Sequence, residues 1–225
     1  MLNPVADGLW ELNEPLAALG MALGHRMTVA RLPDGTLWVH SPVAYRPEIG
    51  DALARLGPVG HVVAPNCVHD TYLEGWFAAY PGRRFHGAKG FSKFRPDLKF
   101  TDTLGASAPA EWAGVLDQLL VRGMPRVNEV VFHHRASRTL ILADLAFNLS
   151  GDAMPLLSRV MLRLNGCYGC FAASRLLRTT IRDRAAVRES LDRILAWDFD
   201  RIIVGHGRNV DSGGKDLLRD AYRFL

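Results

Sequence analysis

The amino-acid sequence predicts a layered α/β protein, built from two sheets or from one mixed sheet. Three observations favour this fold class: hairpin turn signals occur early and late in the chain, short apolar runs have the length of buried strands, and helix-like segments lie between them. A doubly wound nucleotide-binding fold is not expected, because no G-x-G-x-x-G follows a strand and no G-x-x-x-x-G-K-[ST] occurs.

The first part of the chain is predicted to be a hairpin followed by alternating helices and strands. Residues 26–42 place apolar residues on both sides of a Pro-Asp-Gly turn, which is typical of a hairpin. Residues 48–57 have apolar residues at helical spacing and end at Gly-Pro. Residues 60–65 are a short buried strand, residues 70–82 an amphipathic helix, and residues 83–90 another short strand and turn.

The second part of the chain repeats this mixture with more helix. The predicted elements, in order, are a loop at 91–110, a half-helical and half-ambiguous segment at 110–123, a hairpin at 128–145 with a polar tip at His134–Arg138, a mostly helical region at 153–196 that breaks at Gly-Cys-Tyr-Gly, a buried strand at 200–207, and a closing helix. Asp183 is a candidate N-cap for the last helix of the helical region. No repeat or long linker divides the chain, so we expect residues 1–225 to form one domain.

Composition and charge exclude several function classes. The net charge is only +4, and the arginines of residues 175–193 are interleaved with acids, which favours a solvated helix face over a nucleic-acid or anionic-lipid patch. Three cysteines do not make a secreted disulfide framework, and a redox or zinc role for the lone Cys167/Cys170 pair is the lesser alternative. No signal peptide opens the sequence, and arginines interrupt residues 154–177, so we expect a cytoplasmic protein with no membrane span.

Three of the predicted apolar strands run into residues that can bind a metal ion. The first is followed by Cys67, His69 and Asp70, the second ends at Asp144, and the last ends at His206. Loops at the carboxyl ends of buried strands are frequent positions for functional sites in α/β proteins. Imidazole and carboxylate suit zinc, iron or manganese, and a bound divalent ion lowers the pKa of a coordinated water.

Each of these residues also has a purely structural interpretation. Asp70 is a candidate N-cap for a helix at 71–80, and Asp144 is a candidate brace for its loop. His206 stands between two glycines, which permit a tight turn and the close approach of a ligand.

The order and spacing of these elements resemble the metallo-β-lactamase-like superfamily over almost the whole chain. "TLILADLAF" is similar to the strand that ends in the metal-bridging aspartate of the family, and "RIIVGHG" is similar to its last histidine motif. The resemblance implies an αββα four-layer sandwich with the site along one edge of the two sheets. The stretches "VVAPNCVHDTYLEGWFAAYPG" and "NEVVFHHRASRTLILADLAFN" more narrowly resemble a bacterial and plant branch known as a domain of unknown function.

The main signature of the superfamily, H-x-H-x-D-H, is degenerate here. Its six positions fall on residues 65–70, where Pro65 and Cys67 replace the first two histidines and the Asp-His pair is written His69-Asp70. No histidine occurs near "RGMPRVNE", and His40-Ser41-Pro42 stands where the first-strand aspartate is expected. The resemblance therefore implies a reduced site, in which the carried-over metal ligands are His69, Asp70, Asp144 and His206.

The leading hypothesis is a metal-dependent hydrolase with a reduced, mononuclear site. His69 and Asp70 would serve as ligand and orienting group in an unassigned order, which makes Asp70 the catalytic candidate, and the cofactor would be one divalent ion or none. The substrate is an unknown small molecule. The alternative is a non-catalytic descendant that binds a small molecule or a protein partner, and a third hypothesis is thiol chemistry at Cys67. His134 is a further candidate to join the site.

Overall fold

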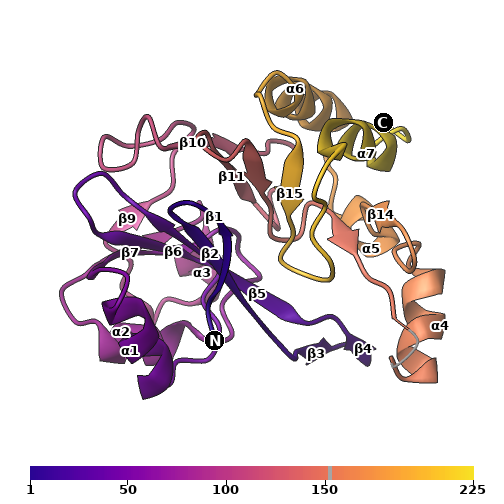
Figure 1. The fold of residues 1–225 in the computed structure, drawn as a ribbon. Coiled ribbons are helices and arrows are strands. Elements are labelled where there is room, and N and C mark those ends of the chain that lie inside the picture. The colour runs from indigo at the N-terminus through magenta and orange to yellow at the C-terminus, as the bar shows by residue number, and fades with distance from the viewer. Residues whose placement is uncertain (152–153) are drawn as a thin grey trace.

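The computed structural model describes residues 1–151 and 154–225 of the chain and shows two β-sheets facing each other with helices outside them (Figure 1). The two sheets come mainly from opposite halves of the sequence, and each is covered by its own helices. This is the four-layer αββα sandwich that the resemblance implied.

The first sheet is formed by the N-terminal half of the chain. Its strands, in spatial order, are β1 (Asn3–Ala6), β2 (Leu9–Glu14), β5 (His25–Arg31), β6 (Leu37–His40), β7 (Val59–Ala64), β8 (Arg84–Gly87) and β9 (Asp102–Thr103). The pairs from β1 to β6 are antiparallel, whereas β6, β7, β8 and β9 run parallel. The carboxyl ends of β6 and β7 therefore meet at one edge of the sheet.

The second sheet follows in the chain and has a similar arrangement. Its strands, in spatial order, are β10 (Leu116–Leu120), β11 (Val130–His134), β12 (Thr139–Ile141) and β15 (Arg201–Ile203). Strands β12 and β15 are parallel, whereas β11 is antiparallel to β12. The carboxyl ends of β12 and β15 consequently lie at the same edge as the start of β11.

The remaining elements are helices and two short ribbons. The helices are α1 (Pro47–Ala54), α2 (Leu73–Ala79), α3 (Phe91–Phe94), α4 (Leu156–Leu164), α5 (Arg175–Arg178), α6 (Arg184–Leu195) and α7 (Gly214–Ala221). The ribbons pair β3 (Ala17–Ala18) with β4 (Met21–Ala22), and β13 (Phe147–Asn148) with β14 (Phe171–Ala172). Figure 1 shows the β3–β4 ribbon reaching from the first sheet toward α4.

Side chains point alternately to the two faces of each sheet and form three apolar layers, one between the sheets and one on the outer face of each sheet. Trp38 of the first sheet and Phe132 of the second point into the space between the sheets, where their rings meet edge to face at 4.8 Å. Val39 lies on the opposite face of the first sheet, against α1 and α2. Val131 lies on the outer face of the second sheet, in the apolar cluster that includes residues of α6 and α7.

Most of the predicted elements are confirmed, with four corrections. The N-terminal residues 3–14 form β1 and β2, which were not predicted. Residues 91–110 contain α3 and β9 in addition to loops, and 110–123 is a series of turns leading into β10 rather than half a helix. The helical region at 153–196 breaks at Gly-Cys-Tyr-Gly as predicted, but it also contains β14 and a second break, at 179–183 between α5 and α6, and its first predicted residue lies outside the described residues. Asp183 caps α6 as predicted, since its carboxylate accepts the Ala186 backbone N–H.

Across the two described ranges, no helix has both the length and the apolar character needed to cross a membrane.

Candidate metal centre

Three loops at one edge of the sandwich bring His69, Asp144 and His206 together. His69 follows β7 in the first sheet, while Asp144 and His206 follow the parallel strands β12 and β15 in the second. Nε2 of His69 lies 3.1 Å from Oδ2 of Asp144, and Nε2 of His206 lies 3.2 Å from Oδ1 of the same carboxylate. One ligand atom from each residue lies within 4.8 Å of the other two. The candidate centre therefore joins the two sheets.

The His206 loop is held by its glycines and by hydrogen bonds. A side chain at Gly205 would meet the Ala143 backbone at 2.7 Å, and Gly207 has a φ of 96°, which disfavours residues with a Cβ. Nδ1 of His206 lies 2.6 Å from the Gly24 carbonyl oxygen, so this nitrogen must carry the proton and donate. In the neutral ring, Nε2 consequently presents a lone pair to Asp144.

The His69 loop is ordered by Asn66 and Ser41. The Asn66 side-chain oxygen accepts the backbone N–H groups of Val68 and His69, both at 3.0 Å, while its amide nitrogen donates to Asp144 Oδ2 at 2.8 Å. Nδ1 of His69 lies 2.7 Å from Ser41 Oγ. Ser41 is fully buried and has a φ of 51°, an unusual backbone conformation for a residue other than glycine.

A second carboxylate, that of Glu129, holds the backbone at Asp144 in place. Glu129, fully buried just before β11, accepts the backbone N–H groups of Ala143 and Asp144 at 2.9 and 2.8 Å. Asn66 also donates to this carboxylate at 3.3 Å. Burial, together with the nearby charge of Asp144, raises the pKa of Glu129 to about 7. Glu129 thus fixes the backbone on which Asp144 stands.

The charges of the cluster favour an ionised Asp144. Burial by itself would raise the pKa of Asp144, but the charge of His69 and, when both ring nitrogens carry protons, hydrogen bonding from His206 outweigh it and hold the pKa well below its usual value. For His69, burial opposes the charged ring, and attraction to Asp144 overcomes it and raises the pKa. A carboxylate facing two imidazole nitrogens is thus an anionic position that attracts a proton or a cation.

Comparisons with known proteins agree with this architecture. No protein-family model matches the chain, and no curated protein matches its sequence. Solved structures match it in three dimensions. The DIM-1 metallo-β-lactamase exposed to ceftazidime has a TM-score of 0.70 and 13% identity, over 100% of this chain and 96% of that chain. The chain has the metallo-β-lactamase fold.

Two further structures with the metallo-β-lactamase fold give the same result. The enzyme from Pontibacter korlensis has a TM-score of 0.66 and 12% identity, over 100% of this chain and 99% of that chain. FIM-1 from Pseudomonas aeruginosa, in its mono-zinc form, has a TM-score of 0.69 and 10% identity, over 100% of this chain and 95% of that chain. Identities this low establish the fold and not the activity.

The structure brings three of the four predicted ligands together, whereas Asp70 lies outside the cluster. Its carboxylate pairs with Arg95 at 3.3 Å, in a group of ion pairs that also contains Glu74 and Asp97. Asp70 is also not the N-cap that the structural interpretation suggested, since α2 begins at Leu73 with Tyr72 as its capping residue.

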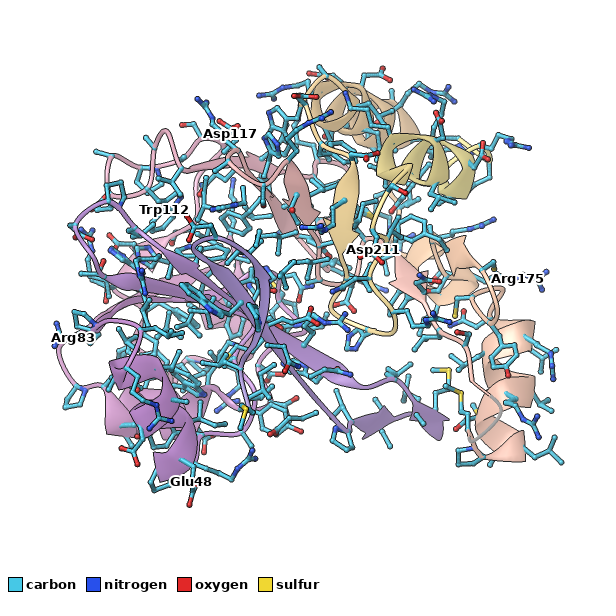
Figure 2. The ribbon with its side chains drawn as sticks, in the orientation of Figure 1. Glu48, Arg83, Trp112, Asp117, Arg175 and Asp211 are labelled. Atoms are coloured by element: carbon cyan, nitrogen blue, oxygen red, sulfur yellow. The ribbon has the colours of Figure 1, made fainter. Side chains whose placement is uncertain are left out.

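Cys67 and His134 lie away from the cluster for different reasons. Cys67 is buried in the apolar cluster around α3, and burial raises its pKa to about 11, so its thiol stays protonated near neutral pH. His134 ends β11, which runs antiparallel to β12, so it lies at the opposite end of the sheet and binds Ser137 there. Asp117, labelled in Figure 2, pairs with the neighbouring His133 at that end.

Several residues around the centre were not predicted from the sequence. His25 begins β5, faces the same pocket as the cluster, and has its ring centroid 5.1 Å from that of His69. Its Nε2 lies within 3.2 Å of the Ser41 and Pro42 carbonyl oxygens, so it donates to them. Burial, reinforced by the neighbouring His69 and His206, lowers the pKa of His25 to about 3. Asn66 and Glu129 carried no recognisable motif, because their roles depend on contacts between distant parts of the chain.

The three clustered side chains fit a divalent metal ion. Bonds of ~2.0–2.2 Å place two ligands of a tetrahedral ion roughly 3.4 Å apart, close to the separations seen around Asp144. Nε2 of His69 is buried without a well-directed hydrogen bond, and Nε2 of His206 presents a lone pair to the carboxylate. Two imidazoles and a carboxylate are a donor set for catalytic zinc and for iron.

Proposed function

We propose that this protein is a metal-dependent hydrolase with one divalent ion held by His69, Asp144 and His206. The proposal rests on two lone pairs that face each other at the centre, one on a His206 nitrogen and one on an Asp144 oxygen. Nδ1 of His206 donates its proton to the Gly24 carbonyl, so Nε2 of the neutral ring carries no proton. This unprotonated Nε2 lies 3.2 Å from an Asp144 carboxylate oxygen. A divalent ion held by His69, Asp144 and His206 would accept these lone pairs and remove the repulsion.

The surrounding residues perform the tasks that such a centre requires. A divalent ion supplies Lewis-acid activation of water near neutral pH. Asn66 and Glu129 hold Asp144 in one orientation, and Ser41 holds the His69 ring, which is the kind of outer support that fixes ligand geometry. The three residues that would hold the ion line a pocket whose volume is about 440 Å³, and a catalytic ion with three protein ligands would keep a position for water or substrate. Zinc is the first candidate ion, since FIM-1 has the same fold and was solved in a mono-zinc form.

The proposal leaves Asp70 outside the ligand set. To act on a water molecule at the centre, its carboxylate would have to leave Arg95, with which it is paired. A catalytic role for Asp70 therefore stays a prediction from the sequence, to be tested by substitution.

Metal analysis of the full chain tests the ligand set directly. The protein is purified without a chelating column, stripped with a chelator, dialysed, and reconstituted with zinc, iron(II) or manganese before elemental analysis. We expect about one equivalent in the wild type, and at least a tenfold weaker affinity in Asp144→Asn and His206→Gln. Asp117→Asn is the matched control, because Asp117 also pairs with a histidine, at 3.1 Å, but far from the centre.

Two results would contradict the proposal. Binding below about a tenth of an equivalent for all three metals would remove the metal centre, where about one is expected. Equal metal binding by wild type, Asp144→Asn and His206→Gln would show that the ion binds at another site. Stoichiometric binding without hydrolysis of any ester, thioester or amide would favour the alternative, a non-catalytic protein that uses the pocket to bind a small molecule.

A further inference from the structure

We propose that the substrate of this site is a neutral ester or thioester whose acyl group is an apolar chain of moderate length. This inference rests on the proposed hydrolase function and deepens it, because it concerns the pocket that opens onto the metal centre. It is drawn from the walls of that pocket, from their charge, and from the exposed apolar residues at its mouth.

The pocket is lined mainly by apolar side chains that come from three separate parts of the chain. The ribbon β3–β4 and its flanking residues form one wall, α5 forms another, and Val127 and Phe147 close the side next to the cluster. The Phe147 ring stacks on that of His206 with centroids 5.5 Å apart, so the apolar wall reaches the centre itself. A volume of about 440 Å³ lies within the range of pockets that enclose small organic ligands.

Apart from the centre itself, the described residues that line the pocket offer no cationic side chain to an anionic group on the substrate. Asp144 is the only carboxylate among the described residues that line it, and no lysine or arginine is found among them. The arginines of α5 do not enter: Arg175 points outward from the molecule in Figure 2, and the guanidinium of Arg178 lies over the Phe224 ring at 4.0 Å. A phosphate or carboxylate group on the acyl chain would be buried here without a protein countercharge, which is costly.

The mouth of the pocket carries exposed apolar residues. Leu19 at the tip of the β3–β4 ribbon is 71% exposed and Leu176 in α5 is 52% exposed, and both line the pocket. The ribbon is fixed in place by Ser158 of α4, which accepts the Ala22 backbone N–H at 3.0 Å and donates to the Gly20 carbonyl at 3.1 Å. Exposed apolar side chains grouped around a pocket are one of the marks of a ligand-binding groove.

The reaction implied is ordinary hydrolysis. The bond between the acyl carbon and the leaving oxygen or sulfur breaks, the oxygen of water bonds to the acyl carbon, and one proton of water passes to the leaving group. The products are a carboxylic acid and an alcohol or thiol, so no oxidant, reductant or second substrate is needed.

Chain-length dependence tests the proposal on the zinc-loaded full chain. The rates of p-nitrophenyl acetate, butyrate, hexanoate and octanoate are compared with that of the p-nitrophenyl monoester of succinic acid, whose acyl chain ends in a carboxylate. We expect kcat/KM to rise about fourfold for each buried CH₂ until the pocket is full, and the succinyl ester to react more slowly than the butyrate.

Binding of a neutral fluorescent probe tests the pocket without catalysis. We expect N-phenyl-1-naphthylamine to bind the metal-free protein and octyl acetate to displace it. Leu176→Glu should weaken the binding of the probe at least tenfold and lower kcat/KM for the octanoate ester by a similar factor. Leu217→Glu is the matched control, because Leu217 is 38% exposed in α7 and does not line the pocket.

The outcomes separate this inference from the proposed function. Hydrolysis that is independent of chain length, or faster for the succinyl ester, would overturn the apolar substrate and leave the hydrolase standing. Probe binding that Leu176→Glu weakens, without hydrolysis of any ester, would support the apolar pocket and overturn the hydrolase. Failure of the probe to bind the wild type would overturn the inference.

Discussion

Arg26 is the side chain whose loss we expect to disturb the metal centre most without touching a ligand. It lies in β5 of the first sheet and is 5% exposed. Its two terminal nitrogens donate to the carbonyl oxygens of Val204 and Gly207, at 2.6 and 2.8 Å, on either side of His206. Its Nε lies 2.9 Å from the Glu11 carboxylate. Replacing Arg26 with Met keeps much of the apolar stem and removes every one of these polar contacts.

The expected loss of stability follows from those contacts. Hydrogen bonds made by a charged donor contribute about 1.5–3 kcal/mol each, and removing one partner of a buried ion pair costs about 3–5 kcal/mol because the other charge is left behind. Glu11 retains a hydrogen bond from Asn209 at 2.6 Å, which offsets part of the cost. We therefore expect Arg26→Met to lower the free energy of unfolding by about 3–5 kcal/mol. The loosened His206 loop should also weaken metal binding about 10- to 100-fold.

Urea denaturation followed by circular dichroism measures the first effect, and competition with a chromogenic chelator measures the second. The control is Arg31→Met in the same strand, because the Arg31 side chain is exposed, donates to the Leu56 carbonyl at 2.9 Å and lies over the Trp10 ring, away from the His206 loop. We expect it to cost less than about 1 kcal/mol and to leave metal affinity unchanged. Equal effects of Arg26→Met and Arg31→Met on both quantities would refute the role assigned to Arg26.

Three further predictions concern pH, the glycine motif and Asp70. Burial, with the neighbouring His61, lowers the pKa of His86 to about 4, so the unfolded chain takes up a proton below pH ~6.5 that the folded chain resists. Acidification from pH ~6.5 to ~4 should therefore cost up to about 3 kcal/mol, and His86→Gln should remove this part of the slope of unfolding free energy against pH. Gly207→Ala should lower the melting temperature more than Gly82→Ala. Both glycines have positive φ, but a side chain at Gly207 would also press on the neighbouring backbone, while Gly82 has open space; equal shifts would contradict the packing argument. Asp70→Asn should leave metal stoichiometry unchanged and cost less than about 1 kcal/mol, because Arg95 keeps other acidic partners; loss of the metal would restore Asp70 as a ligand.

Local signals in the sequence were sufficient for most of the fold. The Pro-Asp-Gly turn, the apolar runs of β7 and β15 and the N-cap at Asp183 each depend on residues a few positions apart. Strand β10 was missed because Leu116, Leu119 and Leu120 also fit helical spacing, and only pairing with β11 selects the extended form. Strands β1 and β2 are short and partly exposed, so the pairing of β1 with β2 and of β2 with β5 left little pattern to detect.

The site was only partly predictable, because its supporting residues act across the sandwich. Asp144 and His206 could be predicted from their places at strand ends, and the structure brings both together with His69. The choice between His69 and Asp70 could not be made from adjacent positions, since it depends on Asn66 turning the loop and on Arg95 attracting the Asp70 carboxylate. Neither contact can be recognised from the neighbouring residues in the sequence.

The altered signature at residues 65–70 has a physical explanation in the packing of its loop. The Pro65 carbonyl accepts the Val130 backbone N–H at 2.8 Å, and the Cys67 backbone N–H donates to the Val127 carbonyl at 2.9 Å. These bonds tie the loop of the first sheet to the start of β11, and the Cys67 side chain packs into an apolar cluster with Phe91. Pro65 and Cys67 thus take part in structural contacts between the sheets.

The remaining cluster takes one ligand from the first sheet and two from the second, so an ion there would cross-link the sandwich at the same edge. A ligand that binds only the folded state stabilises it by RT ln(1 + [L]/Kd), about 4 kcal/mol at a thousandfold excess over Kd. Stability and metal binding are therefore coupled in this chain. Among the described residues, His69, Asp144 and His206 supply the donor set for an ion at this edge.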